Sequence, residues 1–484
     1  MFGSKGHRRS PSALCATAAF VLGAVGLAAG PAGALPVAAN WRAGAAVGSC
    51  TDSWRGGSGP WTAASDWTAG VPDGNTAVVC ITAPGSIVTV DNLDAQINSL
   101  VVGSSAGAPA KLVVASNDKT ESAVGTWKNS EIGRTGIVDL VSSSDVHTYL
   151  ASFGSRNGSS LTNDGRITTA GAQAWLEPDL LNQPDGSITF GARLTEDNCC
   201  TVTNLGKITL EPGATWDFGG DAFVQAGGAI NNYGILRLGV ATFKMLGGQE
   251  THHPVDLDGS TLVDKAPPGA ASFSLSGDDT VAGTIPAGQR VILLAGPNLE
   301  TVVDLASPGV TNDGTILLEA TAAGETDQLG QAHLLNQGTL DIQAAGTGAV
   351  ISAVVTNARN GKVNVSGFGC TISSGFTNYG ALSLGQGSVA QLSGPGFTEG
   401  VGSTLGLQIG PGTTRSGFVA SGNVPISLAG TLRLTTVGAE ARGRAFTVIE
   451  DGDTRPTGKF SPVISPGAAY TVSYDLGSVV LTTG

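Results

Sequence analysis

Apolar and polar residues alternate in short runs along most of this chain. Ile316 and Leu318 are separated by one residue, and Leu382 and Leu384 repeat that spacing. In an extended strand, alternate side chains point to opposite faces, so a period of two places one set of residues on one face. The pattern therefore predicts many short strands, each with its apolar side chains directed into a core.

One short phrase precedes these runs: an apolar residue, then Asn, then Gly after one or more residues. Its asparagines are Asn163, Asn182, Asn204, Asn232, Asn312, Asn336, Asn357 and Asn378. Their spacings are 19, 22, 28, 80, 24, 21 and 21 residues. A recurring period near 20 residues is typical of a solenoid, so we predict one coil per period and three or four degenerate coils within the 80-residue gap.

The chemistry of the phrase fits a tight corner. Gly adopts the positive φ of a sharp turn at no steric cost, and Asn tolerates left-handed conformations and bonds its amide to nearby backbone. Stacked coils would bring successive Asn side chains about 4.8 Å apart, which permits an inward amide ladder. The alternative is that Asn-Gly marks hairpin turns in an antiparallel sandwich, but hairpins do not require the same phrase every 21 residues or so.

We therefore predict an all-β fold, a right-handed parallel β-helix (β-solenoid) of about 20-residue coils with β caps at both ends. The handedness follows from the strong preference for right-handed crossovers between parallel strands. The predicted boundaries are a Trp-rich N-terminal cap over 35–105, solenoid repeats over 106–420 and a C-terminal β cap over 421–484.

Residues 1–34 have the features of an export signal. They begin with basic side chains, continue with an apolar run over 13–30 and end in Ala-Gly-Ala at 32–34, which is a small-residue cleavage site. Adjacent Arg8 and Arg9 permit a twin-arginine route. An uncleaved membrane anchor is the alternative, since the run is near the lower limit for spanning a bilayer. We expect a secreted chain with no membrane contact after signal cleavage.

The composition restricts both the core and the partners. Charged residues make up 13% and aromatic residues 5% of the chain, and 72 positions are Gly, so the core must be built from Val, Ile, Leu and Ala between tight turns. The net charge is −13, and removing the three basic side chains of residues 1–34 leaves −16. Such a chain is a poor partner for nucleic acid, and we predict none.

The cysteines are disulfide candidates because export permits oxidation. Cys50 and Cys80 bracket a Trp-rich segment, and a bond between them would close a loop worth about 3 to 4 kcal/mol in the chain-entropy model. If Cys370 and Cys200 are about eight coils apart, roughly 38 Å separates them and no disulfide joins them. Cys199 and Cys200 then pair with each other, stay free or bridge molecules. The spacings do not match a metal site.

Both ends of the mature chain resemble a known family. Residues 54–81 carry Trp-rich phrases and a Val-Pro turn, residues 86–103 supply a strand pair, and residues 426–484 contain Gly-Thr-Leu and Tyr-x-Val-x-Tyr strands. These segments resemble the ends of secreted bacterial β-solenoid proteins related to autotransporter passenger domains, which are adhesin-like. The resemblance implies a capped solenoid. Unlike autotransporters, the chain has no room for a membrane barrel, so we expect it to be released or held at the cell surface.

The densest group of ionisable side chains lies in residues 251–259, with His252, His253, Asp256 and Asp258. A metal site would need these ligands to converge. Adjacent histidines on a strand point to opposite faces and Pro254 interrupts regularity, so we interpret the segment as a solvated loop. Acidic stretches at 276–284 and 450–454 lack the spacing of a calcium loop and are interpreted as surface turns. We predict no metal, cofactor or catalytic residue.

The tryptophans have two interpretations. Trp54, Trp61 and Trp67 could form an aromatic platform for a sugar ring, or could cover the end of the solenoid, where unpaired strand edges invite aggregation. We favour the end cap. Trp127, Trp175 and Trp216 are scattered in the sequence and receive no role.

The predicted function is that of a secreted, non-enzymatic scaffold, an adhesin-like protein whose long face makes repeated weak contacts with cell-wall or extracellular polysaccharide. The alternative is a carbohydrate-active β-helix enzyme, a polysaccharide lyase or hydrolase with its site within residues 240–300. Such an enzyme sets acids and bases on adjacent coils. Here Asp164 and Asp313 share a position in the phrase but are 149 residues apart.

Overall fold

A computed structural model describes most of the chain after residue 47. The described ranges are 48–117, 120–143, 147–152, 159–196, 200–295, 300–320, 324–344, 348–410, 415–438, 443–452, 455–466 and 469–484. The predicted signal peptide at 1–34 and Cys199 lie outside them. The described residues form a parallel β-solenoid of about 15 turns, which confirms the predicted fold class. Among them, no helix is long and apolar enough to cross a membrane.

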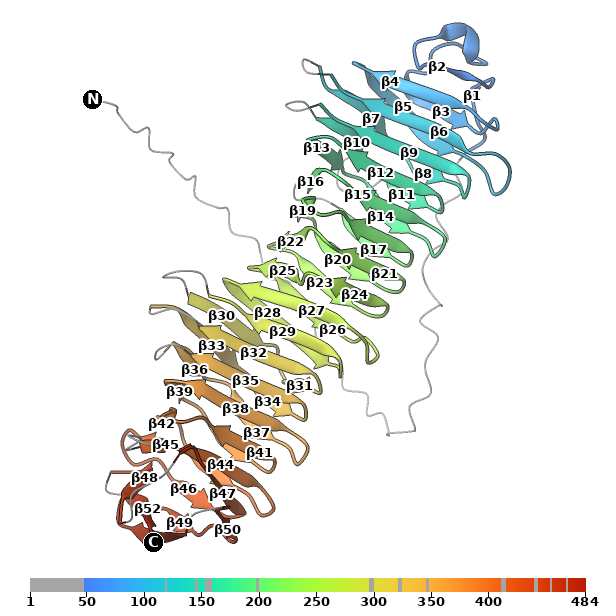
Figure 1. The fold of residues 1–484 in the computed structure, drawn as a ribbon. Helices are drawn as coiled ribbons and strands as arrows, with labels where there is room; N and C mark the ends of the chain where they lie inside the picture. The colour runs from blue at the N-terminus through green and yellow to red at the C-terminus, as the bar shows by residue number, and fades with distance from the viewer. Residues whose placement is uncertain are drawn as a thin grey trace, which may run out of the picture. The chain divides into compact units, whose positions relative to one another are not determined.

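Each coil places strands on three faces, and the coils stack in chain order (Figure 1). Face 1 is formed by β7 (Ser122–Thr126), β10 (Thr148–Ser152), β13 (Gln173–Leu176), β16 (Arg193–Glu196), β19 (Thr215–Phe218), β22 (Ile235–Gly239), β25 (Val255–Asp258), β27 (Ala271–Ser276), β29 (Gln289–Leu293), β32 (Thr315–Ala320), β35 (Thr339–Ala344), β38 (Lys362–Gly367), β41 (Ala381–Leu384), β44 (Thr404–Ile409), β47 (Thr431–Thr436) and β50 (Val463–Ile464).

Face 2 follows face 1 in each coil. Its strands are β8 (Ser130–Ile132), β11 (Ser160–Asn163), β14 (Asp179–Asn182), β17 (Thr201–Asn204), β20 (Ala222–Gln225), β23 (Thr242–Met245), β26 (Thr261–Asp264), β28 (Asp278–Ile285), β30 (Glu300–Leu305), β33 (Thr326–Gln331), β36 (Ala349–Ile351), β39 (Gly369–Ile372), β42 (Val389–Leu392), β45 (Arg415–Ala420) and β48 (Ala445–Glu450).

Face 3 closes the coil in two separate sheets. The first contains β2 (Ser58–Pro60), β4 (Ile87–Asp91), β6 (Ala110–Ala115), β9 (Gly136–Val141), β12 (Arg166–Ala170), β15 (Ser187–Phe190), β18 (Lys207–Leu210), β21 (Ala229–Asn232) and β24 (Gln249–His252). The second begins at the end of β28 and contains β31 (Val310–Asn312), β34 (His333–Asn336), β37 (Val354–Asn357), β40 (Phe376–Asn378), β43 (Phe397–Glu399), β46 (Ile426–Leu428) and β49 (Thr457–Gly458).

The break in face 3 falls at residues 265–270, which form no strand. This segment contains Pro267 and Pro268, which have no backbone N–H to donate to a neighbouring strand. Faces 1 and 2 continue past it, because β25 pairs with β27 and β26 pairs with β28. The gap between Asn232 and Asn312 therefore contains four coils, which begin at β22, β25, β27 and β29.

The core is one apolar layer per coil. On β38, Val363 and Val365 are buried while Lys362 and Asn364 are exposed, as the alternation predicts. Aromatic rings also stack between coils, as where Phe376 and Phe397 have ring centroids 5.8 Å apart. Because each layer is covered by the layers above and below it, short strands suffice to bury the apolar side chains.

Two buried amide ladders connect the coils. In the first, at the corner between faces 2 and 3, each side-chain amide donates to the next coil: Asn163 to Asn182 at 2.8 Å, Asn182 to Asn204 at 2.7 Å and Asn204 to Gln225 at 2.8 Å. In the second, at the corner between faces 3 and 1, the chain runs from Asn312 through Asn336 and Asn357 to Asn378, with 2.7 Å at every step. The phrase thus occupies different corners in the two halves of the solenoid.

Asn232 is not a member of the first ladder, although the phrase aligns it with Asn204. It ends β21, in register with Leu210 and His252, and its amide donates to the carbonyls of His253 and Pro254, both at 3.0 Å. The first ladder instead continues to Gln225, which lies 21 residues after Asn204 and seven before Asn232. The irregular 28-residue spacing therefore marks the change from one corner to the other within a single coil.

The glycine of the phrase has a different role from the predicted one. Gly380 does not adopt a positive φ, but a Cβ at this position would lie 2.2 Å from the carbonyl oxygen of Ala358 in the preceding coil. The residue is required because two backbones approach closely, and not because the turn is left-handed. The predicted side-chain contact to backbone does occur, since the Gly380 N–H donates to Asn378 Oδ1 at 3.1 Å.

Parallel pairing starts at β1 (Asp52–Ser53) and continues through β3 (Gly74–Ile81) and β5 (Asp94–Val102). At the other end parallel pairing continues to β50. There β51 (Tyr470–Asp475) and β52 (Ser478–Thr483) form an antiparallel hairpin, and β52 also pairs antiparallel with β48. The expected boundaries at 105 and 421 therefore lie inside the stack.

The tryptophan cluster lies at the N-terminal end of the described residues, around the 3-10 turn η1 (Ala64–Asp66). Trp54, Trp61 and Trp67 are 3% exposed or less, and both Trp54 and Trp61 pack edge-to-face on Trp67 with ring centroids 5.0 Å apart. Buried rings cannot serve as a platform for a sugar. The arrangement is that of an end cap.

The cysteines follow the predicted pairing in part. Cys50 and Cys80 form a disulfide with their Cα atoms 5.8 Å apart, which ties the first strand to β3. Cys370 is buried and free. Cys200 is also disulfide-bonded.

The second ladder ends on a carboxylic acid. Glu399 Oε2 accepts from the Asn378 amide at 2.9 Å and from the Ser403 hydroxyl at 2.5 Å. Burial raises the pKa of Glu399 to about 7, although both hydrogen bonds oppose the shift. The folded protein therefore favours the protonated acid at this position.

Replacing Asn357 should weaken the solenoid. Asn357→Ala removes the donor to Asn378 and the acceptor for Asn336, and leaving buried amide groups unpaired costs about 2 to 4 kcal/mol in total. Urea denaturation measures this loss. The matched control is Asn364→Ala, an exposed asparagine on the next strand along the chain, for which we expect a change within about 0.5 kcal/mol. Equal effects of the two substitutions would contradict a stabilising ladder.

Stability should fall as the pH rises from 5 to 8. Because the pKa of Glu399 is about 7 in the folded protein and 4.5 ordinarily, its favourable contribution is complete below pH 4.5 and is lost as the pH passes through 7. Glu399→Gln keeps a hydrogen-bond acceptor but cannot become charged. Its free energy of unfolding relative to the native protein should therefore be higher at pH 8 than at pH 4.5 by on the order of 3 kcal/mol. Denaturation at both pH values measures this. Glu300→Gln, at an exposed site, should leave the pH dependence unchanged, and a Glu399→Gln variant with the native pH dependence would refute the assignment.

Candidate functional site

The outward side chains of face 1 form a continuous row across the coils. They alternate with inward apolar residues, as Ser383 does between Leu382 and Leu384. In register order, the row contains Tyr149, Trp175, Thr195, Asp217, Arg237, Asp256, Ser274, Ile292, Leu317, Asp341, Asn364, Ser383, Gly406 and Arg433. Successive members are about 4.8 Å apart. We call this set the face 1 row.

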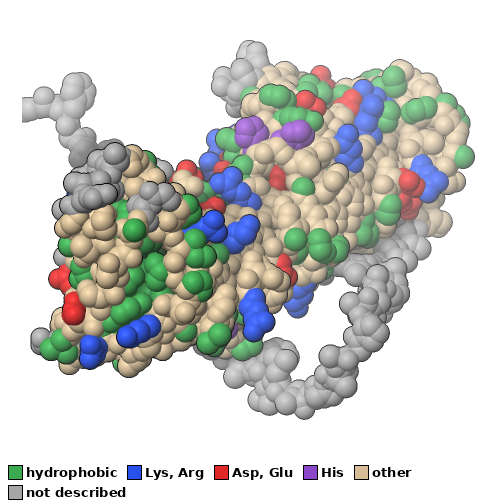
Figure 2. Space-filling model, turned by 60° about the horizontal axis from the view of Figure 1, so that its bottom comes forward, with side chains coloured by type: hydrophobic (Ala, Val, Ile, Leu, Met, Phe, Trp, Pro, Cys, Tyr) green, Lys and Arg blue, Asp and Glu red, His purple; other side chains and the backbone are tan. Residues whose placement is uncertain are grey.

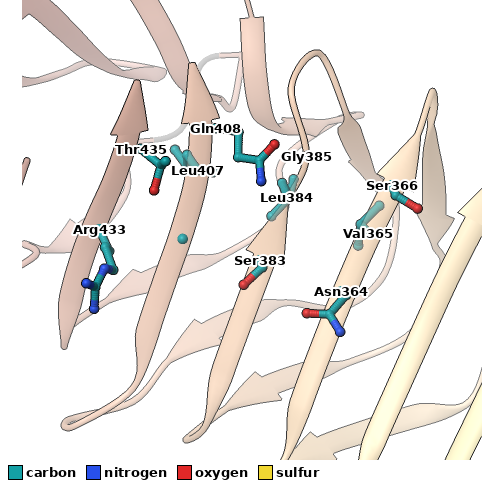
Figure 3. A pocket seen from close by; sticks show the side chains of 11 residues that line it. Asn364, Val365, Ser366, Ser383, Leu384, Gly385, Leu407, Gln408, Arg433 and Thr435 are labelled. Atoms are coloured by element: carbon teal, nitrogen blue, oxygen red, sulfur yellow. The ribbon is translucent and has the colours of Figure 1, made fainter. Parts of the chain in front are cut away.

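The face 1 row is hollowed near its C-terminal end, between β38, β41, β44 and β47 (Figure 3). The hollow has a volume of about 340 Å³. It exists because Ser383, Gly385 and Gly406 have small or no side chains where their neighbours have long ones. We call it the face 1 groove.

Polar groups of several kinds line the face 1 groove. The sides carry the Asn364 and Gln408 amides, the Ser366 and Thr435 hydroxyls and the Arg433 guanidinium. Asn364 donates to Asp341 Oδ1 at 2.6 Å, which orients its amide. Hydrogen-bond donors and acceptors thus surround a small open floor, an arrangement that suits a ligand rich in hydroxyl groups.

An ionic ladder occupies the middle of the face 1 row. Asp217 accepts from Arg193 at 2.9 Å and from Arg237 at 3.3 Å. Asp256 follows Arg237 in register; burial raises its pKa, while Arg237 and His253 oppose the shift. Asp217 is therefore paired with two cations, which makes it a poor candidate for proton transfer to a substrate.

The predicted cluster of residues 251–259 is divided between two faces. His252 ends β24 on face 3 and stacks on Tyr233 with ring centroids 3.9 Å apart, whereas Asp256 and Asp258 lie on β25 of face 1. The predicted solvated loop is therefore wrong for His252, Asp256 and Asp258, which belong to strands. Of the four residues, only His253 lies in the short turn between β24 and β25. In the part of the chain that the structure describes, no three His, Cys, Asp or Glu side chains are grouped to hold a metal ion.

The acids with the strongest shifts lie inside the solenoid. Burial raises the pKa of Glu250 to about 8 and the pKa values of Asp264, Asp279 and Asp327 to about 7, and each is 2% exposed or less. Asp279 belongs to β28 and not to the predicted surface turn, while Asp451 is also buried. A polymer outside the solenoid cannot reach these four buried groups.

One group of side chains on face 1 was missed from the sequence. His147 lies just before β10, Tyr149 lies within β10, and Trp175 lies on the neighbouring strand β13. The ring centroids of Tyr149 and Trp175 are 5.6 Å apart. We call them the aromatic cluster. Tyr149 and Trp175 are 26 residues apart in sequence, and only the register of the coils makes them neighbours. A pair of outward aromatic residues at equivalent positions of consecutive repeats is the signal that would identify such a cluster.

The charge distribution also bears on the ligand. In Figure 2, uncharged side chains and backbone form most of the visible surface, and basic and acidic groups are interspersed. A strongly basic face is absent from this view of the described residues. No protein-family model matches the chain, and a search of curated proteins finds no match. The function is therefore inferred from the fold and the face 1 row.

Proposed function

We propose that this protein is a secreted, non-enzymatic scaffold of the cell surface or extracellular matrix, adhesin-like, that binds polysaccharide along face 1. The face 1 groove carries the proposal, because it combines amide, hydroxyl and guanidinium groups around an open floor. A sugar polymer presents many hydroxyl groups at regular intervals. A sheet face with polar groups on most of its coils is suited to meet them.

The repetition of the face 1 row supports a polymer over a small molecule. Each polar contact on an exposed sheet is weak, but contacts to linked units of one polymer act together and raise the overall affinity. Asp341, Asn364 and Ser383 lie on adjacent coils at the spacing of paired strands, and Arg433 lies two coils beyond Ser383. The long, mostly uncharged row favours extended association over a single tight site.

The placement of acids supports a scaffold over an enzyme. General acid catalysis of glycoside cleavage needs a carboxyl group at the substrate, whereas the carboxyl groups with the highest pKa values, Glu250 and Asp264, face the core. On face 1, Asp217 is paired with two arginines. These three acids are thus buried or paired and not free to act on a substrate.

Two features support the proposed compartment. The expected export signal at 1–34 implies secretion, and the disulfide between Cys50 and Cys80 is typical of proteins outside the reducing cytosol.

Filling the face 1 groove should abolish binding to polysaccharide there. Gly406→Leu places an outward side chain where a Cβ has only Ser383 Oγ as close as 3.3 Å and where φ is not positive, so the fold should tolerate it. We expect at least tenfold weaker retention on the polysaccharides that the native protein binds, measured by co-sedimentation with a panel of insoluble glycans.

The matched control is Gly239→Leu, at an outward position of β22 on the same face but outside the groove, where a Cβ meets nothing within 4 Å. It should bind like the native protein. Equal binding by all three proteins would contradict the groove as the contact site. Release of reducing or unsaturated ends from any glycan of the panel would contradict a non-enzymatic scaffold and favour the lyase or hydrolase alternative.

A further inference from the structure

The aromatic cluster is built from three rings on adjacent coils of face 1. The His147 ring stacks on Trp175 with centroids 5.8 Å apart and planes at 29°, and Tyr149 lies 5.6 Å from Trp175 and 5.9 Å from His147. All three side chains are partly exposed. By contrast, the core ring of Trp216 in the same sheet is fully buried. Stability of the core does not account for rings placed outside it.

Hydrogen-bonding groups surround these rings. The Tyr149 hydroxyl donates to Glu121 Oε1 at 3.2 Å and lies 3.0 Å from His147 Nδ1. Burial and the nearby carboxylates of Glu121 and Glu177 raise the pKa of Tyr149 to about 12, so the phenol remains a neutral donor. The cluster therefore offers an apolar surface with polar groups at its edge, as a sugar ring requires: one face of C–H groups and a rim of hydroxyls.

The charges near the aromatic cluster select among sugars. Glu121 and Glu177 are the groups whose charges act on Tyr149, and both are acidic. The nearby Arg193 is engaged by Asp217. A uronic acid or a sulfated sugar would be repelled at this position. An uncharged ring avoids that cost.

We propose that the aromatic cluster is a binding subsite for an uncharged pyranose ring, with one sugar face stacked on Trp175 and its hydroxyls on the Tyr149 and Glu121 side chains. This deepens the proposed function, on which it rests, by naming the class of sugar. The cluster belongs to the face 1 row, eleven register steps from Gly406. At about 4.8 Å per step, roughly 53 Å separates the two sites.

This distance separates the two proposals experimentally, because a tetrasaccharide is too short to span it. The probes are cellotetraose and N-acetylchitotetraose, which are uncharged, and tetragalacturonate, which is anionic. Isothermal titration calorimetry measures binding to the full chain. We expect at least one uncharged tetrasaccharide to bind, tetragalacturonate not to bind, and Trp175→Ala to weaken the uncharged ligand at least tenfold.

Two further variants keep the test decisive. Trp175→Phe retains an aromatic face and should keep part of the affinity even if Trp175→Ala disturbs the strand, and thermal melting checks that each variant is folded. Tyr379→Ala removes an exposed ring outside the cluster and should bind normally.

The outcomes distinguish the two sites. Loss of tetrasaccharide binding in Trp175→Ala but not in Gly406→Leu supports the subsite, even if the groove proves to bind nothing. The subsite is overturned if no uncharged tetrasaccharide binds, if Trp175→Ala binds as tightly as the native protein, or if tetragalacturonate binds better than the uncharged probes.

Discussion

A buried amide inside a protein must find a partner, and in this solenoid the partner is the same amide one coil away. Paired strands are about 4.8 Å apart, which lets Asn357 donate to Asn378 while it accepts from Asn336. Any change in the height or register of one coil would leave a donor or an acceptor unpaired. The ladders therefore hold successive coils in register, and the positions of the outward side chains depend on that register.

The change of corner shows how the fold tolerates irregularity. One coil contains both Gln225 at the first corner and Asn232 at the second, so the polar interior passes from one ladder position to the other within a single turn. Face 3 is interrupted soon afterwards, whereas faces 1 and 2 keep their pairing. The face 1 row is consequently in register on both sides of the interruption. A site that uses several coils can be built on face 1 for this reason.

The chain separates its ionisable groups by location. Acids such as Glu250 and Asp264 are buried, and folding favours their neutral forms. On face 1, Asp217 is paired with arginine and Asp341 accepts a hydrogen bond from an amide. Face 1 also carries outward hydroxyl, amide and aromatic groups. This distribution favours recognition of an uncharged polymer over chemistry on it.

Much of the fold follows from the sequence alone. The alternation at Leu382 and Leu384 determines strands with one buried face, and the 21-residue spacing of Asn336, Asn357 and Asn378 determines stacked coils, because both patterns repeat locally. Only the tertiary structure decided which corner each asparagine occupies, that Gly380 is needed for a close backbone approach, that Trp175 meets Tyr149, and where the face 1 groove lies. The reason is that the residues that become neighbours on adjacent coils depend on the number of residues in each intervening turn. Because the turns differ in length, equivalent positions do not recur at a constant spacing in the sequence.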